Sequence, residues 1–333
     1  MKFKAAALMG AAAIALMAGS VSAADLACLI TKNDTNPFFV KMREGAQAAA
    51  TAAGLDFQAA AGVKDGDAAP QITAIENCVA AGAKGILITP SNDSVGPALK
   101  AARDAGVLVI ALDTPLADKD AQDVTFATDN FEAGLLIGKW AAATMGDKAA
   151  TAKIAMLDIN KDNISVDVAR DTGFLVGFGI EVPDLKVMGS ETDARVIGHE
   201  SSDASPAGGQ KAMETLLAKD PDINVVYTIN EPAAEGAYQA LKAAGKEKSV
   251  LIVSVDGGCA GVRNVQAGVI GATSQQYPLK MASMGVAAGV NYAKTGKKAS
   301  GYVDTGVALI TNKAMAGVKS NDGKFGLANC WGQ

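Results

Sequence analysis

Residues 86–113 read ILITPSNDSVGPALKAARDAGVLVIALD, and residues 225–256 read VVYTINEPAAEGAYQALKAAGKEKSVLIVSVD. Each stretch contains an apolar strand, a polar loop with a proline, a helix with Ala-Leu-Lys-Ala-Ala, a glycine stop, a second apolar strand and a final aspartate. The shared order of these features predicts one structural unit that occurs twice, once in each of two lobes. Apolar strands that alternate with helices are typical of parallel sheets covered on both faces.

The same alternation extends over the rest of the chain. It predicts further strands at 26–31, 85–89, 107–112, 153–158, 225–229 and 250–255. It predicts helices at 36–53, 71–81, 95–105, 131–145, 168–179, 208–218 and 233–244. The expected fold class is therefore α/β, with two similar doubly wound parallel-sheet lobes.

The two final aspartates of the repeated unit, Asp113 and Asp256, are the first candidates for a binding site. Ligands of open parallel sheets lie beyond the carboxyl ends of the strands, and both residues follow a strand at that end. If the lobes face each other, both carboxylates point into the gap between them. The alternative is that each aspartate only caps a turn or helix, but its repetition in both units favours a ligand role.

The first residues have the pattern of a secretory signal peptide. Lys2 and Lys4 precede the apolar stretch 5–18, and Val21-Ser22-Ala23 supplies small residues for cleavage. We expect residues 1–23 to be removed and the protein to be exported. The roughly 310 residues that remain are more than one core usually holds, which predicts two domains.

The net charge and the cysteine content restrict the possible classes of protein further. The formal net charge is −5, with no basic stripe, which argues against a nucleic-acid partner. Four cysteines in an exported chain indicate disulfides, and four allow three pairings. We favour Cys28–Cys78 and Cys259–Cys330, because a flavodoxin-like strand order brings the helix of Cys78 over the first strand and a second bridge would hold the C-terminal tail near the cleft. The alternative is four small buried thiols.

No metal or cofactor is expected. The cysteine spacings are too wide for a CxxC zinc site, and His199 is the only histidine. The loop after the first strand, 31–35, lacks the glycines that a dinucleotide-binding fingerprint requires.

The segment Thr35-Asn36-Pro37-Phe38-Phe39 follows the first strand. Asn36 suits a helix N-cap and Pro37 the first helical position, which is a purely structural interpretation. Two adjacent phenylalanines need a further reason. One ring can pack in the core while the other faces the strand ends, where it would stack on the apolar face of a sugar.

The whole chain after residue 23 resembles the periplasmic sugar-binding proteins of ABC importers, in the ribose-binding-like group, and within it the fructose import binding proteins of rhizobia. The similar segments are ACLITKNDTNPFFVKM, GAKGILI, VIALDTPL, FATDN, ARDTGF, TINEPAAEGAY, LIVSVDGGC, GATSQQYPL, VDTGV and CWG. This resemblance implies a type I periplasmic binding protein fold. It also implies a multi-strand hinge near Thr128 and Tyr277. The expected lobes are residues 24–128 plus 277–306 and residues 129–276 plus 307–333.

The resemblance also implies roles for individual residues. Asn36 would be a polar contact, Phe38 and Phe39 the stacking rings, and Asp113 the carboxylate of the first lobe. The remaining implied ligand contacts are Asp129 and Asn130 at the crossover, and Arg170, Asn230, Asp256 and Gln276 in the second lobe. An alternative for Arg170 is a helix ion pair with Asp167.

Two departures from the ribose binders bear on the choice of sugar. The ribose binders have an arginine directly after the first aspartate, where this chain has Thr114. Their second-lobe aromatic residue has no counterpart near Asp203 and Ala204. We therefore expect fructose before ribose or mannose.

The expected function is capture of a monosaccharide between the lobes and its delivery to the permease subunits of an ABC importer. We expect a monomer without enzymatic activity, and a chemoreceptor partner is compatible with this role. One alternative is a secreted carbohydrate-active enzyme that uses Asp113 and Asp256 as an acid–base pair. Against it, a pocket of monosaccharide size has no second sugar unit to cleave. A repressor with the same core would need an N-terminal DNA-binding domain in place of the signal peptide.

Overall fold

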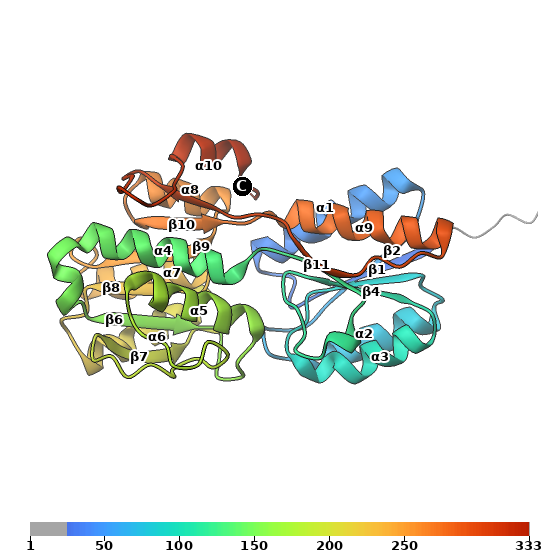
Figure 1. Ribbon diagram of the computed structural model, residues 1–333, viewed down its shortest axis with the longest axis horizontal. Helices are drawn as coiled ribbons and strands as arrows, with labels where there is room; N and C mark the ends of the chain where they lie inside the picture. The colour runs from blue at the N-terminus through green and yellow to red at the C-terminus, as the bar shows by residue number, and fades with distance from the viewer. Residues whose placement is uncertain (1–24, 333) are drawn as a thin grey trace, which may run out of the picture.

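The structure is a computed structural model that describes residues 25–332, so the signal peptide predicted at 1–23 lies outside the described residues. Within that range the chain forms two lobes side by side, each built on a six-stranded sheet (Figure 1). None of the helices in residues 25–332 has the length and apolar character needed to span a bilayer. The expected α/β class with two similar lobes is confirmed.

Sheet one belongs to the N-terminal lobe, and all its strands are parallel. Its order across the sheet is β2 (Asp56–Ala61), β1 (Leu26–Thr31), β3 (Gly85–Ile88), β4 (Leu108–Leu112), β5 (Val124–Ala127) and β11 (Gly301–Asp304). The first five strands have the flavodoxin-like order that the disulfide argument assumed.

Sheet two repeats this order in the C-terminal lobe. Its strands are β7 (Val196–Ser201), β6 (Ile154–Asp158), β8 (Val225–Thr228), β9 (Leu251–Asp256), β10 (Ala272–Gln275) and β12 (Ala308–Thr311). The repeated sequence unit is β3–α3–β4 in one lobe and β8–α7–β9 in the other, at equivalent places in the two sheets. The predicted duplication is therefore confirmed.

One strand departs from the expected parallel arrangement, because β12 pairs antiparallel with β10. The carboxyl ends of both sheets face the boundary between the lobes. The chain leaves sheet one at the carboxyl end of β11 and therefore enters sheet two at the edge where the carboxyl ends of the other strands lie. The strand that it forms there, β12, must run in the opposite direction to those strands.

Helices cover both faces of each sheet. In the N-terminal lobe α1 (Pro37–Ala53) and α9 (Pro278–Thr295) lie on one face, and α2 (Ala69–Ala80) and α3 (Gly96–Asp104) lie on the other (Figure 1). In the C-terminal lobe α4 (Asn130–Met145) and α5 (Ser165–Phe178) share one core with the sheet. On the opposite face α6 (Pro206–Lys219) and α7 (Glu231–Ala243) form another. Two short helices, α8 (Cys259–Gln266) and α10 (Gly323–Asn329), pack together beside β12.

The chain passes between the lobes three times, after β5, after β10 and after β11. These crossovers bind one another: the Thr305 amide donates to the Ala127 carbonyl at 2.9 Å, and the Asp129 amide donates to the Asp304 carboxylate at 3.2 Å. Lys280, at the start of α9, donates to the Thr305 carbonyl at 2.8 Å. Adjacent, mutually bonded crossovers of this kind can act together as a hinge.

Glycines allow α4 and α5 to approach unusually closely. Gly134 and Gly138 on α4 face Gly173 and Gly177 on α5. A Cβ built on Gly134 would overlap the carbonyl oxygen of Arg170, and one built on Gly173 would overlap the carbonyl oxygen of Phe131. The two backbones are therefore in direct contact, as in small-xxx-small helix pairs. This contact fixes the position of α5 along the axis of α4. It thereby fixes the position of Arg170 relative to the crossover that leads into α4.

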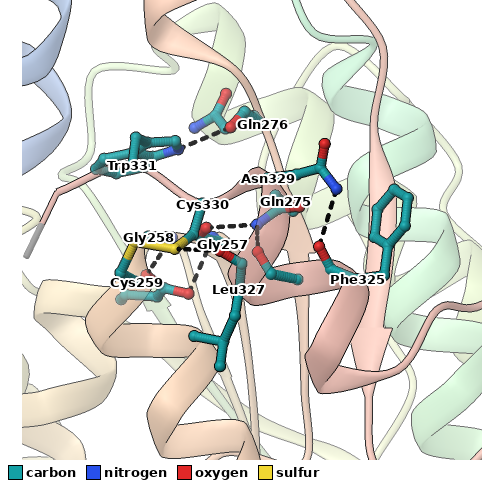
Figure 2. The surroundings of a disulfide bond; sticks show 12 residues. Gly257, Gly258, Cys259, Gln275, Gln276, Phe325, Leu327, Asn329, Cys330 and Trp331 are labelled. Carbon is teal, nitrogen blue, oxygen red and sulfur yellow. Dashed lines mark hydrogen bonds between the residues drawn. A yellow bond between two sulfur atoms is a disulfide. The ribbon is translucent and has the colours of Figure 1, made fainter.

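Both disulfides have the favoured pairing. Cys28 of β1 is bonded to Cys78 of α2, and Cys259 of α8 is bonded to Cys330 beyond α10. Figure 2 shows the second bridge, with the Cys259 amide donating to the Trp331 carbonyl at 2.9 Å. Trp331 Nε1 donates to the Gln276 carbonyl at 2.8 Å in the crossover between β10 and α9. The C-terminal tail is thereby held at the boundary between the lobes.

We predict that Gly134→Ala lowers the free energy of unfolding by about 1–3 kcal/mol, the usual cost of inserting a methyl group into a closed contact. Urea unfolding monitored by circular dichroism measures this change. Gly289→Ala in α9 is the matched control, since no atom lies within 4 Å of a Cβ built there. It should be neutral or stabilising by up to about 1 kcal/mol. Equal effects of the two substitutions would contradict the close approach of α4 and α5.

Candidate functional site

A cavity of about 320 Å³, including space open to solvent, lies between the lobes at the carboxyl ends of both sheets. Most of the predicted site residues line it: Asn36, Phe38, Phe39, Asp113, Arg170, Asn230, Asp256 and Gln276. A second cavity, of about 520 Å³, shares Asn36 and Asp256 with the first and extends beside Trp331. The interlobe boundary therefore brings together residues that are far apart in the sequence.

Asp113 and Asp256 enter the cavity from opposite lobes. Asp113 follows β4 and Asp256 ends β9, and both side chains are buried. Their backbone φ angles are +63° and +139°, values that L-residues seldom adopt. Such conformations persist where the surrounding structure enforces them, and they gather at functional sites. The repeated unit thus turns the chain sharply in both lobes and directs each carboxylate toward the boundary.

Arg170 connects the two lobes through a buried guanidinium group. Its Nη2 lies 3.5 Å from Asp113 Oδ1 and 3.3 Å from Gln276 Oε1, and its Nη1 donates to the Ile229 carbonyl at 3.1 Å. Its Nε donates to Asn130 Oδ1 at 2.7 Å. The ion pair with Asp167 that we considered is not formed, because the guanidinium group faces the cavity.

Gln276 continues the same network to the second carboxylate. Its Nε2 donates to Asp256 Oδ1 at 2.9 Å while its Oε1 accepts from Arg170. An amide that donates on one side and accepts on the other joins Asp113, Arg170 and Asp256 into one chain of polar contacts. A ligand with hydroxyl groups can insert into such a chain, because a hydroxyl also donates and accepts.

The apolar wall of the cavity comes from α1. The rings of Phe38 and Phe39 lie 5.5 Å apart edge to face, and the Phe38 ring is 5.4 Å from the ring of Trp331. All three side chains are buried in the core of the N-terminal lobe. We expected one ring to pack in the core and the other to face the strand ends, whereas both rings belong to the core and both line the cavity.

Asn36 and Asn230 combine two roles. Asn36 is the N-cap of α1 and accepts from the Phe38 amide at 3.0 Å, so the capping interpretation of this residue is confirmed. Asn230 is the N-cap of α7, accepts from the Ala233 amide at 3.0 Å and donates to the Ala204 carbonyl at 3.1 Å. Both residues also line the cavity, which follows from the position of a helix N-terminus at the carboxyl end of a parallel strand.

Asp129 and Asn130 lie apart from the cavity lining. Asp129 is exposed, and its carboxylate caps α4 by accepting from the Glu132 amide at 2.9 Å. Asn130 is buried and contacts Arg170, while its Nδ2 donates to the Thr128 carbonyl at 3.1 Å. In this structure Asn130 positions Arg170, and Asp129 has a structural use at the crossover.

The sequence did not reveal Lys32 and Asp65, which also line the cavity. Both are buried, and Lys32 Nζ lies 3.5 Å from Asp65 Oδ1. Burial raises the pKa of Asp65, and the neighbouring ammonium group of Lys32 opposes this rise. Lys32 directly follows β1, so its position at a strand end was a usable signal. Asp65 follows β2, which we did not predict.

Glu231 is a third residue that the sequence did not single out. Its carboxylate accepts from the amides of Gly257 and Gly258 at 2.9 and 3.0 Å and from the Thr273 hydroxyl at 2.8 Å. These bonds hold the loop that follows Asp256. Burial, and then the nearby charge of Asp256, raise the pKa of Glu231 to about 8. In the sequence it resembles an ordinary acidic residue in the first turn of a helix.

The protonation state of Asp256 should affect stability. Burial raises its pKa to about 7 from the ordinary value of 3.8, the nearby Asp113 adds to the rise, and Arg170 and Gln276 oppose it. Between these pH values the folded protein keeps a proton that the unfolded chain loses, so its free energy of unfolding decreases as pH rises. We predict that Asp256→Asn makes this decrease smaller, measured by urea unfolding of ligand-free protein from pH 4 to pH 8. The same pH dependence in wild type and variant would show that Asp256 does not hold this proton.

The sequence comparisons agree with this architecture. Residues 27–298 match the periplasmic binding protein domain. The ribose import binding protein of Haemophilus influenzae is 31% identical over 276 residues, which cover 81% of this chain and 86% of that protein. The D-allose-binding periplasmic protein of Escherichia coli is 26% identical, over 85% of this chain and 88% of that protein.

Solved structures share the fold. An ABC transporter solute-binding protein from Agrobacterium vitis with bound D-fucose has a TM-score of 0.73 and 25% identity, and the match covers 86% of this chain and 95% of that one. A protein from Actinobacillus succinogenes with bound D-allose has a TM-score of 0.75 at 22% identity, over 86% and 97% of the two chains. These are solute-binding proteins and not enzymes. The chain therefore belongs to the periplasmic binding protein family, in the group that includes the ribose import binding proteins, and has the type I two-lobe fold.

Proposed function

We propose that this protein captures a monosaccharide in the interlobe cavity and delivers it to the permease subunits of an ABC importer. The observation that carries the proposal is the buried network of Asp113, Arg170, Gln276 and Asp256, which contacts the cavity from both lobes beside two aromatic rings. Carboxylates, amides and a guanidinium group offer acceptors and donors to sugar hydroxyls, and the rings suit the CH face of a sugar.

The charges around the cavity favour an uncharged ligand. Asp113, Asp256 and Asp65 are opposed by Arg170 and Lys32 in the lining, and the raised pKa of Asp256 brings the balance close to neutral near pH 7. A strongly charged solute would leave one of these buried groups without a counter-charge, which is costly. A polyhydroxylated neutral solute does not disturb the balance.

Of the monosaccharides, we infer that fructose is the preferred one. Thr114, whose hydroxyl donates to Asp113 Oδ2 at 2.9 Å, stands where the ribose binders have arginine. Ala204 contributes only a methyl group to the lining. The curated relatives are named for ribose, D-apiose and D-allose, so fructose specificity rests on these departures.

The same proposal includes export of the protein and its interaction with the importer. Residues 1–23 would be removed during secretion, and the mature protein would act in the periplasm as a monomer. The residues that bind sugar come from both lobes, so the ligand favours the closed arrangement to the extent that it binds that arrangement more tightly. The importer would distinguish the two arrangements by the surface around the cleft, as would a chemoreceptor.

We predict that one monosaccharide of a panel containing fructose, ribose, mannose and allose binds with a micromolar dissociation constant, measured by isothermal titration calorimetry. At 100 times that constant the ligand should stabilise the fold by about 2.7 kcal/mol, seen as a higher thermal midpoint. A response to ribose without a response to fructose would refute the choice of fructose alone. No response to any sugar of the panel would refute monosaccharide capture.

We predict that Asp256→Ala weakens binding of that sugar by more than about tenfold, since removing a buried carboxyl group leaves its hydrogen-bond partners unsatisfied at a cost of about 1–3 kcal/mol. Asp34→Ala is the matched control, because Asp34 is exposed in the loop before α1 and outside the cavity. The control should keep the affinity of the wild type. Calorimetry on both variants decides the matter, and unchanged affinity in Asp256→Ala would remove this residue from the binding site.

A further inference from the structure

A second group of polar side chains lies in the C-terminal lobe outside the interlobe cavity, and its two aspartates are buried. It consists of Asp158 at the end of β6, Asp171 on α5 and His199 on β7, and their nitrogen and oxygen atoms lie within 4.8 Å of one another. His199 Nδ1 is 2.8 Å from Asp158 Oδ2 and 3.5 Å from Asp171 Oδ2. Asp171 follows Arg170 on the helix, so the two side chains point about 100° apart, one to the cavity and one to this group.

Several oxygen atoms of this region have no hydrogen-bond partner among the residues that the structure describes. Asp171 is fully buried and accepts no hydrogen bond on either carboxylate oxygen, and Asp158 Oδ1 and Asp167 Oδ1 are also unpaired. The hydroxyl group of the fully buried Tyr227 has no partner either. Tyr227 lies on β8, where it pairs with Met156 of β6, two residues before Asp158.

Buried carboxylates without partners are rare, because removing a charge from water is costly unless a counter-charge replaces the water. His199 is the one basic side chain bonded to the group in residues 25–332, and it faces at least three carboxylates. One positive charge is too little for this number of acids. A bound cation would supply the missing charge and would occupy the unpaired oxygens.

The remaining nitrogen of His199 is already oriented in the way that metal ligands require. Its Nε2 lies 2.7 Å from Glu191 Oε1. A histidine that donates one ring N–H to a carboxylate presents the other nitrogen as a lone pair, and this arrangement fixes the ring and strengthens the metal bond. Here Glu191 would accept from Nε2–H, and Nδ1 would face the cation beside Asp158 and Asp171.

The spacing and the access route fit as well. Ligands 2.0–2.1 Å from a tetrahedral centre are about 3.3 Å apart, and the two separations at His199 Nδ1 lie on either side of that value. A surface cavity, whose lining also includes Lys161, opens from solvent onto Asp158 and His199. A cation could therefore enter without unfolding the lobe.

We propose that Asp158, Asp171 and His199 bind a divalent transition-metal cation, Zn²⁺ or Mn²⁺, with Glu191 as the carboxylate that orients His199. One imidazole with carboxylates suits these ions, whereas Ca²⁺ prefers a set of oxygen ligands alone. The site lies in one lobe and is separate from the proposed sugar site. Bound metal would tie β6, β7 and α5 together directly behind Arg170.

The test uses untagged mature protein stripped with a chelator, then titrated with ZnCl₂, MnCl₂ and CaCl₂ by calorimetry, with the bound metal counted by mass spectrometry. We expect one Zn²⁺ or Mn²⁺ per chain and a higher thermal midpoint. The chain has a single histidine, so His199→Gln removes the only imidazole. This variant should weaken binding by about 100-fold or more, whereas adventitious binding to surface carboxylates would survive it.

Asp171→Asn separates metal binding from simple packing. Replacing an unpaired buried carboxylate by an amide of the same shape should leave the metal-free thermal midpoint unchanged or higher, while metal binding is lost. Glu191→Gln should weaken binding by about 10- to 100-fold. Asp184→Asn, at an exposed site in the same lobe, should bind as the wild type does. Sugar titration confirms folding of each variant independently. No metal bound at tenfold molar excess, a response to Ca²⁺ alone, or equal binding by wild type and Asp171→Asn would overturn the proposal.

Discussion

The guanidinium group of Arg170 is the constraint on which the interlobe site depends. It stays charged at every accessible pH, so burial obliges the structure to give it partners. Three of these, Asn130, Ile229 and Gln276, belong to the C-terminal lobe and the crossovers, and the fourth, Asp113, belongs to the N-terminal lobe. If the lobes separate, only Asp113 is lost, and the others keep the group in place. The guanidinium group can therefore keep the same geometry in an open and in a closed arrangement of the two lobes.

The contact with Asp113 is also the longest of the four, at 3.5 Å. A buried ion pair of such geometry adds little to stability, because the loss of hydration offsets most of the attraction. A ligand hydroxyl between the Asp113 carboxylate and the Arg170 guanidinium group could form a hydrogen bond to each of them, at shorter distances than their direct contact. Closure of the lobes would then follow from the ligand, since only a difference in affinity between two arrangements can shift their populations. The glycine contact of α4 with α5 matters here because it keeps Arg170 at the height of Asp113.

Much of the fold could be predicted from the sequence, because its strongest signals are periodic and repeated. Strands with apolar runs, such as 85–89 and 250–255, and helices ended by glycine follow from local propensity. Two of the strands that escaped prediction, β2 and β11, lack that signal. β2 reads DFQAAA and β11 reads GYVD, and both are largely exposed edge strands held in place by their neighbours. Their pairing depends on contacts between distant segments, which a local pattern does not contain.

The candidate site divides in the same way. Asp113 and Asp256 follow from the duplication, and Asn36 and Asn230 follow from helix capping, because topology puts strand ends and helix starts at one edge. Arg170 and Gln276 required the resemblance to a family, whereas the two adjacent phenylalanines after the first strand already indicated a stacking wall. Lys32, Asp65 and Glu231 are residue types that ordinarily lie in solvent, and only the position of Lys32 at the end of a predicted strand indicated a place at the cavity. The group around His199 could not be predicted for a related reason. Its histidine and its acidic residues are far apart in the sequence, and they become neighbours only because β6 pairs with β7.

The C-terminal tail has an optical consequence. The chain contains two tryptophans. Trp140 is buried in the C-terminal lobe with its Nε1 bonded to the Lys313 carbonyl, away from the boundary. Trp331 is tied to the C-terminal lobe by the neighbouring Cys259–Cys330 disulfide (Figure 2). Its indole nevertheless packs against Phe38 of the N-terminal lobe. Any relative rotation of the lobes changes the surroundings of the Trp331 indole, while the surroundings of Trp140 stay constant. The protein therefore contains a fluorescent reporter of domain motion together with an internal reference.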